Sequence, residues 1–172
     1  VYYHVWDNYP YPDFNRSSYI SNDYIACISK VTHDIIQTVA PETESSYLPH
    51  SVNTDIFKPY SESDIKTLRR DNFKDQDHKT IFFWNNRNAR RKQTGSVVFW
   101  FKEFLDRVGH DKAKLIMHTD PFDPHGQNLY ALMENLGLSG EQFMISQEKM
   151  PPEQLAALYN MADCTVNIAD AE

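Results

Sequence analysis

The feature that most constrains the fold is a regular alternation of short apolar runs with amphipathic segments in the second half of the chain. Runs typical of strands occupy residues 80–84, 113–119, 142–146 and 164–169. Between them, the segments 96–108, 126–138 and 153–163 repeat apolar side chains at the spacing of one helical face. Short strands separated by helices lie parallel in a sheet, because each helix returns the chain to the same end. The alternation therefore predicts an α/β fold with a doubly wound parallel sheet.

The first part of the chain carries a weaker version of this pattern. Residues 1–6 and 23–30 are typical of strands, and residues 31–39 of a helix. Residues 41–60 hold three prolines and show no helical or alternating period, so we predict an ordered connector. Ser61 followed by Asp64 predicts the start of a surface helix over residues 61–73. Because the chain opens in a strand and stops just after one, we expect a segment of a longer protein, truncated at both ends.

Composition and charge exclude several classes of protein. The 172 residues are 41% hydrophobic and 24% charged, which is ordinary for a globular protein. No stretch approaches the roughly 20 apolar residues of a transmembrane helix, and the first residues do not resemble a signal peptide. Cys27 and Cys164 lie far apart in apolar runs, so we expect buried thiols and a cytoplasmic location. The net charge of -7 disfavours nucleic acid as a partner.

One stretch runs against this acidic charge. Residues 84–95, WNNRNARRKQTG, hold Arg87, Arg90, Arg91 and Lys92 between a predicted strand and a predicted helix. Ligands of doubly wound sheets bind at the carboxyl ends of strands, where basic side chains beside a helix start favour a phosphate. The sequence has no glycine-rich phosphate motif, so side chains would have to hold the anion. A solvated basic loop is the alternative.

The loops after the other three strands belong to the same edge of the predicted sheet. The loop after the second strand holds two histidines and two aspartates: His118, Asp120, Asp123 and His125. These residue types suggest the polar lining of a cleft, a metal site, or an aspartate that caps the next helix. The loop 146–151 offers backbone groups and Met150 to a flat base. Glu172, after the last strand, is placed to accept hydrogen bonds from sugar hydroxyls, or else belongs to a frayed terminus.

Taken together, these segments resemble the group-one (family four) glycosyltransferases of the GT-B fold, in which two Rossmann-like domains face each other. YLPHSVNTDIFKP resembles the family's interdomain connector, NNRNARRK its Arg-x4-Lys element, and LYNMADCTVNIADAE the helix and strand before its glutamate motif. DNYP and DYIACIS resemble the end of the acceptor domain. The resemblance implies an acceptor-side part over residues 1–48, a connector over 49–60 and an incomplete donor-binding domain over 61–172.

The resemblance also implies roles for single residues. Arg87 and Lys92 match the pair that holds the donor diphosphate and stabilises the leaving group, and Glu172 matches a glutamate that contacts the donor sugar. These three are the candidate catalytic residues. The implied donor-binding set is Asn86, Arg87, Lys92, His118, Thr119, Gln147, Met150 and Glu172. The resemblance implies neither a metal nor a cofactor, because the nucleotide sugar is a substrate.

The function implied is a hexosyltransferase that moves a sugar from a nucleotide sugar to a glycan, lipid or protein acceptor, retaining the anomeric configuration without a metal. Peripheral contact with a membrane is common in the family. We expect the chain alone to bind nucleotide weakly and to turn over nothing. A nonenzymatic phosphate- or nucleotide-binding module and a sugar-nucleotide epimerase of the same fold are the alternatives. Ser51, Asn85 and Asn86 stand where the family usually has glycine.

Overall fold

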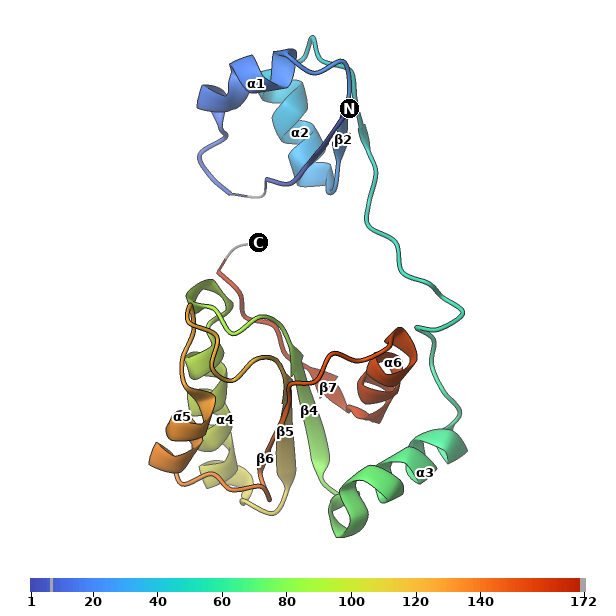
Figure 1. Cartoon of the computed structure of the whole chain (residues 1–172), viewed down its shortest axis with the longest axis vertical. Coiled ribbons are helices and arrows are strands. Elements are labelled where there is room, and N and C mark those ends of the chain that lie inside the picture. The colour runs from blue at the N-terminus through green and yellow to red at the C-terminus, as the bar shows by residue number, and fades with distance from the viewer. Residues whose placement is uncertain (7, 171–172) are drawn as a thin grey trace. The chain divides into compact units, whose positions relative to one another are not determined.

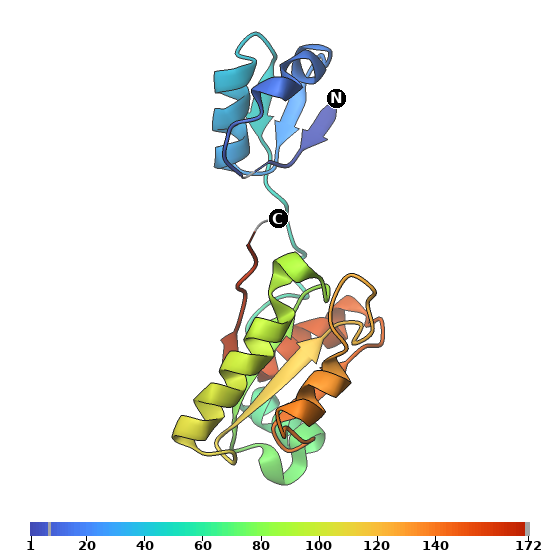
Figure 2. The same ribbon diagram turned by 90° about the vertical axis from the view of Figure 1, so that its left-hand side faces the viewer.

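The computed structural model describes residues 1–6 and 8–170, which form two compact units. The first unit is Val1–Val52 and the second is Asn53–Asp170. Each unit has its own parallel sheet with helices packed against it (Figures 1 and 2). None of the described helices is long and apolar enough to cross a membrane.

The first unit is built on a small parallel sheet with the strand order β1-β2-β3. Its elements are β1 (Tyr2–His4), η1 (Asp13–Asn15), α1 (Arg16–Ile20), β2 (Ile25–Cys27), α2 (Lys30–Val39) and β3 (Ser45–Tyr47). Helix α2 begins at Ser29, whose hydroxyl accepts a hydrogen bond from the Thr32 amide at 3.0 Å. Its apolar face, which includes Ile35 and Ile36, is fully buried.

Strand β3 lies inside the segment for which the sequence predicted a connector, so that prediction was wrong for residues 45–47. The strand is only three residues long, and two of them are serines. It is also an edge strand, with its residues half-buried or exposed. A strand this short and polar shows no alternation, because neither face is fully covered.

The second unit is a four-stranded parallel sheet with the order β6-β5-β4-β7. Its strands are β4 (Thr80–Asn85), β5 (Ala113–His118), β6 (Phe143–Ser146) and β7 (Cys164–Thr165). Its helices are α3 (Glu62–Phe73), η2 (Lys74–Gln76), η3 (Arg90–Lys92), α4 (Thr94–Val108), α5 (Leu129–Asn135) and α6 (Pro152–Met161).

Helices cover both faces of this sheet, as Figure 1 shows with α4 and α5 on one side and α3 and α6 on the other. Side chains alternate along β4 accordingly. Trp84 packs in the cluster with α4 and α5, while Ile81 and Phe83 pack in the cluster with α3 and α6. A parallel strand that is buried on both faces requires apolar side chains on each of them. The predicted α/β fold with a doubly wound parallel sheet is confirmed.

The strand order places a switch point at the carboxyl ends of β4 and β7. The chain runs from β4 to β5 to β6 in one direction and then returns to the opposite side of β4. Loops that leave two such strands diverge to opposite faces, which opens a crevice where ligands of this fold bind. The basic stretch follows β4, so it lies at this point.

The predicted ends of one strand and one helix of the second unit were wrong. The predicted strand 164–169 shortens to Cys164 and Thr165, with one further hydrogen bond from the Val166 amide to the Phe83 carbonyl of β4 at 2.9 Å. Cys164, which we expected to be buried, is exposed because β7 is the edge of the sheet. Cys27 is buried, as expected.

The predicted helix 126–138 shortens to α5. Asn128 caps its first turn, because its side chain accepts from the Ala131 amide at 3.1 Å. Neither aspartate of the preceding loop caps this helix.

Candidate functional site at the strand carboxyl ends

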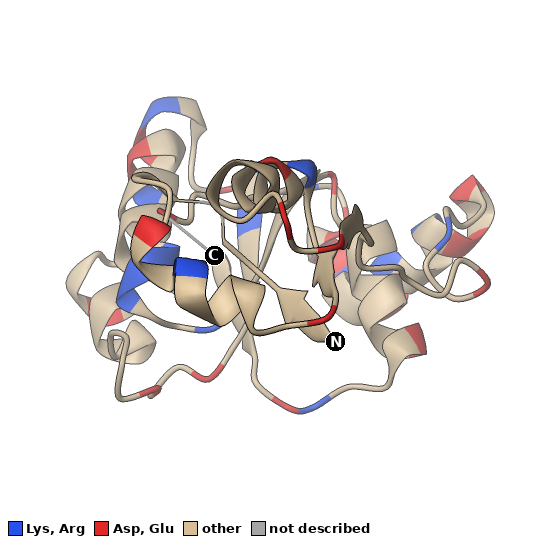
Figure 3. Cartoon of the chain, turned by 90° about the horizontal axis from the view of Figure 1, so that it is seen from above, with Lys and Arg blue, Asp and Glu red and all other residues tan. Residues whose placement is uncertain are grey.

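The loop after β4 and the segment after β7 meet at the switch point. The Asp170 amide donates to the Arg91 carbonyl at 2.8 Å, and the Gln93 side-chain amide donates to the Asp170 carboxylate at 2.6 Å. Basic and acidic residues are scattered over the chain in Figure 3, whereas η3 consists of Arg90, Arg91 and Lys92 alone. The topology therefore sets a wholly basic turn against the end of the described chain.

Gln93 joins this basic turn to α4 through a left-handed backbone conformation, with φ at 53° and ψ at 34°. This conformation costs a residue with a side chain roughly 1–2 kcal/mol. Two hydrogen bonds hold it: the one to Asp170, and one that its side-chain oxygen accepts from the Ser96 hydroxyl at 3.1 Å. The sharp turn places η3 directly before the start of α4. Lys92 is buried there, while Arg90 and Arg91 are exposed.

Arg87 is held by the loop that follows β5. Its Nε donates to Asp123 Oδ2 at 2.6 Å, and its Nη2 lies 3.3 Å from Asp123 Oδ1 and 2.8 Å from His125 Nδ1. The Arg87 guanidinium and then the His125 backbone amide hold the pKa of the Asp123 carboxyl well below its ordinary value. In return, the Asp123 carboxylate raises the pKa of Arg87. Nη1 of Arg87 has no hydrogen-bond partner within residues 1–6 and 8–170, so it is available to an anion.

A buried asparagine ties the same two loops together. Asn88 is completely buried, and its Nδ2 donates to the carbonyls of Gln127 at 2.7 Å and Asp120 at 3.3 Å. Its Oδ1 accepts from the Gln127 amide at 3.2 Å. Gly126 packs so closely that an added Cβ would lie 2.2 Å from the Asn88 carbonyl oxygen. The loops after β4 and β5 are therefore one connected structure.

Sequence reasoning missed Asn88 and the role of Asp123. The available signal for Asn88 was an amide inside a basic loop, since a side-chain amide can donate two hydrogen bonds and also accept at one buried position. Asn86, which the resemblance implied instead, is half-buried just after β4. Its neighbour Asn85 donates to the Tyr159 hydroxyl at 3.0 Å. Asp123 was considered as a cleft, metal or capping residue, and the structure shows it paired with Arg87.

Two more of the predicted donor-binding residues, His118 and Thr119, lie at the carboxyl end of β5. The register aligns Asn85 of β4 with His118 of β5, and His118 with Ser146 of β6. His118 Nδ1 lies 2.9 Å from the Ser146 hydroxyl. Thr119 is buried, and its hydroxyl has no hydrogen-bond partner in the described part of the chain. These residues thus share the edge of the sheet that carries Arg87.

The other three implied residues differ in their surroundings. Gln147 is exposed just after β6. Met150 packs against the apolar cluster that contains Phe83 and Ile116. Glu172 lies outside the described residues. Among residues 1–6 and 8–170, no three histidine, cysteine, aspartate or glutamate side chains gather as metal ligands.

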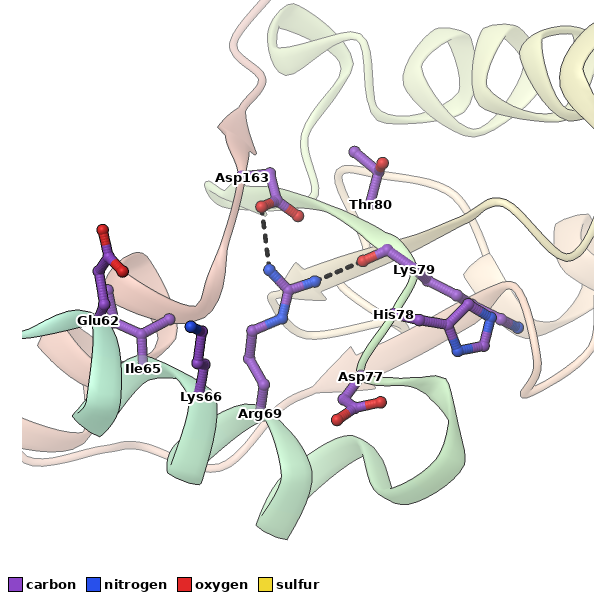
Figure 4. Close-up of a pocket in the computed structure, with 9 residues that line it drawn as sticks. All are labelled: Glu62, Ile65, Lys66, Arg69, Asp77, His78, Lys79, Thr80 and Asp163. Atoms are coloured by element: carbon purple, nitrogen blue, oxygen red, sulfur yellow. Dashed lines mark hydrogen bonds and ion pairs between the residues drawn. The ribbon is translucent and has the colours of Figure 1, made fainter.

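A pocket of about 410 Å³ lies at the other end of the strands, beside the amino ends of β4 and β7 (Figure 4). The arginine that lines this pocket is bound to other residues of the chain, because Arg69 donates to Asp163 at 2.9 Å and to the Lys79 carbonyl. Asp163 also accepts from the Ile81 amide at 2.7 Å. These contacts fix α3 to the sheet. The candidate site is therefore the carboxyl edge.

The fold was compared with known proteins. No protein-family model and no curated protein matches the sequence. Among solved structures, HepE of Anabaena in complex with UDP-glucose shares 12% identity at a TM-score of 0.66, over 93% of this chain and 43% of its own. The α,α-trehalose 6-phosphate synthase of Burkholderia multivorans shares 9% identity at a TM-score of 0.70, over 91% and 41%. The catalytic domain of starch synthase IV of Arabidopsis thaliana, bound to ADP and acarbose, shares 11% identity at 0.56, over 87% and 35%.

These likenesses establish the fold. The chain has the α/β architecture with parallel sheets on which glycosyltransferases of the GT-B fold are built. It spans less than half the length of each of these solved structures.

Proposed function

We propose that this chain is part of a glycosyltransferase that binds a nucleotide-sugar donor at the carboxyl edge of the second sheet. The observation that carries the proposal is the basic loop at the switch point. Arg87 is oriented there by Asp123, and its Nη1 has no hydrogen-bond partner among the described residues. Two structures of the same fold were solved with UDP-glucose and with ADP, and both ligands carry a diphosphate. A diphosphate is the anion that two neighbouring cations suit best.

In this proposal, Arg87 and Lys92 act on the leaving group. When the bond between the sugar and the diphosphate breaks, its electron pair moves to the phosphate oxygen, and negative charge grows there. Cations fixed at that oxygen stabilise the transition state more than the ground state. Asp123 keeps Arg87 in place before the donor arrives, so little reorganisation is needed. Hexose transfer with retention, without a metal, and membership of the group-one (family four) enzymes are parts of the proposal.

The other assignments follow from the same placement. We propose that Asn86, His118 and Thr119 line the donor near its phosphates and sugar, and that Gln147 and Met150 lie beside the base. Glu172 would contact the sugar. Residues 1–48 would belong to the acceptor-side domain, residues 49–60 to the connector and residues 61–172 to the donor domain. The acceptor, a glycan, lipid or protein, would be bound by other parts of a longer cytoplasmic protein.

The test uses the full-length protein with a panel of nucleotide sugars. Arg87→Ala and Lys92→Ala should each lower turnover by about a hundredfold or more, as removal of other transition-state donors does. Arg107→Ala, an exposed arginine in the last turn of α4, is the matched control and should keep normal turnover. Circular dichroism checks the fold, which matters for the buried Lys92.

The outcomes separate the candidate functions. Normal turnover in Arg87→Ala contradicts the proposal. A wild-type protein that shows no turnover but binds nucleotides in a steeply salt-dependent way is a binding module. Conversion of the nucleotide sugar to its isomer without an acceptor identifies an epimerase.

A further inference from the structure

A small cavity of about 130 Å³ lies between the start of α4 and the loop that ends at Gln127. Arg90, Thr94, Gly95, Ser96 and Gln127 are among the residues that line it. Its volume is well below the roughly 300–1,000 Å³ of pockets that hold drug-sized ligands. The cavity therefore suits a small group and is too small for a whole nucleotide.

Within the described residues, the first backbone amides of α4 have no hydrogen-bond partner, and their residues line this cavity. The first hydrogen bond of α4 joins the Val97 amide to the Gln93 carbonyl at 3.0 Å, so the amides of Thr94, Gly95 and Ser96 precede it. The capping residue, Gln93, makes no side-chain bond to these amides, and the first turn has no acidic residue. Such a helix start carries about half a positive charge and favours an anion.

An unpaired hydroxyl in the same cavity points to a ligand independently. Thr94 is 97% buried, being 3% exposed, and its Oγ1 has no hydrogen-bond partner within the described residues. Burying a hydroxyl without a partner is unfavourable, and native structures satisfy nearly all such groups. A bound oxygen acceptor would satisfy this one.

Arg90 is the one charged residue among the described residues that line the cavity. No aspartate or glutamate of the described residues lines it, although the Asp170 carboxylate accepts at 2.6 Å from Gln93, which does line it. Arg90 lines it and is exposed, and its guanidinium makes no ion pair or hydrogen bond within residues 1–6 and 8–170. One arginine, one hydroxyl and the amides of a helix start are the donors that a tetrahedral oxyanion takes.

We propose that this cavity binds a phosphate group, held by Arg90, the Thr94 hydroxyl and the amides of Gly95 and Ser96. This site is separate from the Arg87 contact and does not depend on the proposed glycosyl transfer. The phosphate has two possible sources: a free phosphate or small phosphorylated ligand, or a phosphate of the nucleotide bound at the neighbouring basic loop.

The test is a calorimetric titration of the full-length protein with inorganic phosphate at constant ionic strength. Saturable binding is expected, and the Gly95 and Ser96 amide resonances should shift in step with it. Arg90→Ala and Thr94→Val should each weaken binding by about tenfold or more, the usual effect of losing a hydrogen bond to a charged group. Thr94→Val keeps the side-chain shape and removes only an unpaired hydroxyl, so it should fold normally. Arg107→Ala, at the other end of the same helix, should bind phosphate like the wild type.

A second arm adds a nucleoside diphosphate. If it displaces inorganic phosphate, and Arg87→Ala weakens nucleotide binding but leaves phosphate binding unchanged, the cavity holds a phosphate of the nucleotide. If both bind together, the cavity holds a separate phosphate. Absence of saturable phosphate binding in the wild type would overturn the proposal, and so would wild-type affinity for phosphate in both Arg90→Ala and Thr94→Val. If the wild-type protein binds inorganic phosphate but no nucleotide, the result counts against the proposed glycosyl transfer and leaves the phosphate site in place.

Discussion

Gly126→Ala tests whether the loops after β4 and β5 form one connected structure. The new Cβ would lie 2.2 Å from the Asn88 carbonyl oxygen and 2.3 Å from Asn88 Oδ1. Carbon and oxygen atoms do not approach this closely, and the nearest atom belongs to the backbone, so a rotamer change cannot relieve the contact. Asn88 is completely buried and has no free space in which to move. The loops must shift apart.

The cost follows from the contacts that a shift would break. Overpacking of a buried site costs about 1–3 kcal/mol. Asn88 makes three hydrogen bonds to the second loop, and losing even one adds about 1 kcal/mol. We therefore expect Gly126→Ala to lower the free energy of unfolding by about 2–4 kcal/mol. Donor binding should weaken as well, because the same shift separates Arg87 from Asp123.

Urea unfolding followed by tryptophan fluorescence measures this change, since Trp84 is buried in β4 of the same unit. Gly140→Ala is the matched control, because an added Cβ there meets nothing within 4 Å. The control should stay within about 0.5 kcal/mol of the wild type. If Gly126→Ala unfolds as the control does, the two loops are not packed as the structure shows.

Three further predictions concern stability. Asp123→Asn should destabilise the protein at neutral pH, because Asp123 stabilises the fold only while its carboxyl group is ionised. The difference in stability from the wild type should shrink as pH falls below the ordinary carboxyl pKa of 3.8. Acid titration of both proteins shows whether their stability curves converge. Leu105→Ala, in the buried face of α4, should lower the free energy of unfolding in urea by about 2–5 kcal/mol. Phe99→Ala, at a half-exposed position of the same helix, should lower it far less. Equal decreases in the two variants would contradict the packing of α4. Ser29→Ala should cost about 0.5–2 kcal/mol by removing the cap of α2, and an unchanged midpoint would show that the cap does not contribute.

The elements of the second unit followed from local sequence because they are buried on one or both faces. Burial of one face of α4 requires apolar residues at the helical period, and burial of both faces of β5 requires a nearly continuous apolar run. Both patterns are visible in one sequence. The short β3 and the edge strand β7 were missed or overextended for the converse reason. Their residues are half-covered or exposed, so burial imposes no pattern on them.

The candidate site divides in the same way. The charge of the basic loop and its place after a strand were evident from the sequence, because both are local properties. The partner of Arg87 was not evident. Asp123 lies 36 residues away, and only the pairing of β4 with β5 brings its loop beside the arginine.

The sequence by itself determined that this chain forms strands and helices in alternation, with a concentrated positive charge at the end of one strand. The tertiary structure decided which loops meet. It placed β7 beside β4, so that Asp170 holds Gln93 and turns the basic residues toward the start of α4. It also made Asn88 a buried link between two loops, and it left the Thr94 hydroxyl, in a cavity, without a hydrogen-bond partner in the part of the chain that the structure describes. Strand order and loop packing arise from contacts between distant residues, and local periodicity carries no record of them.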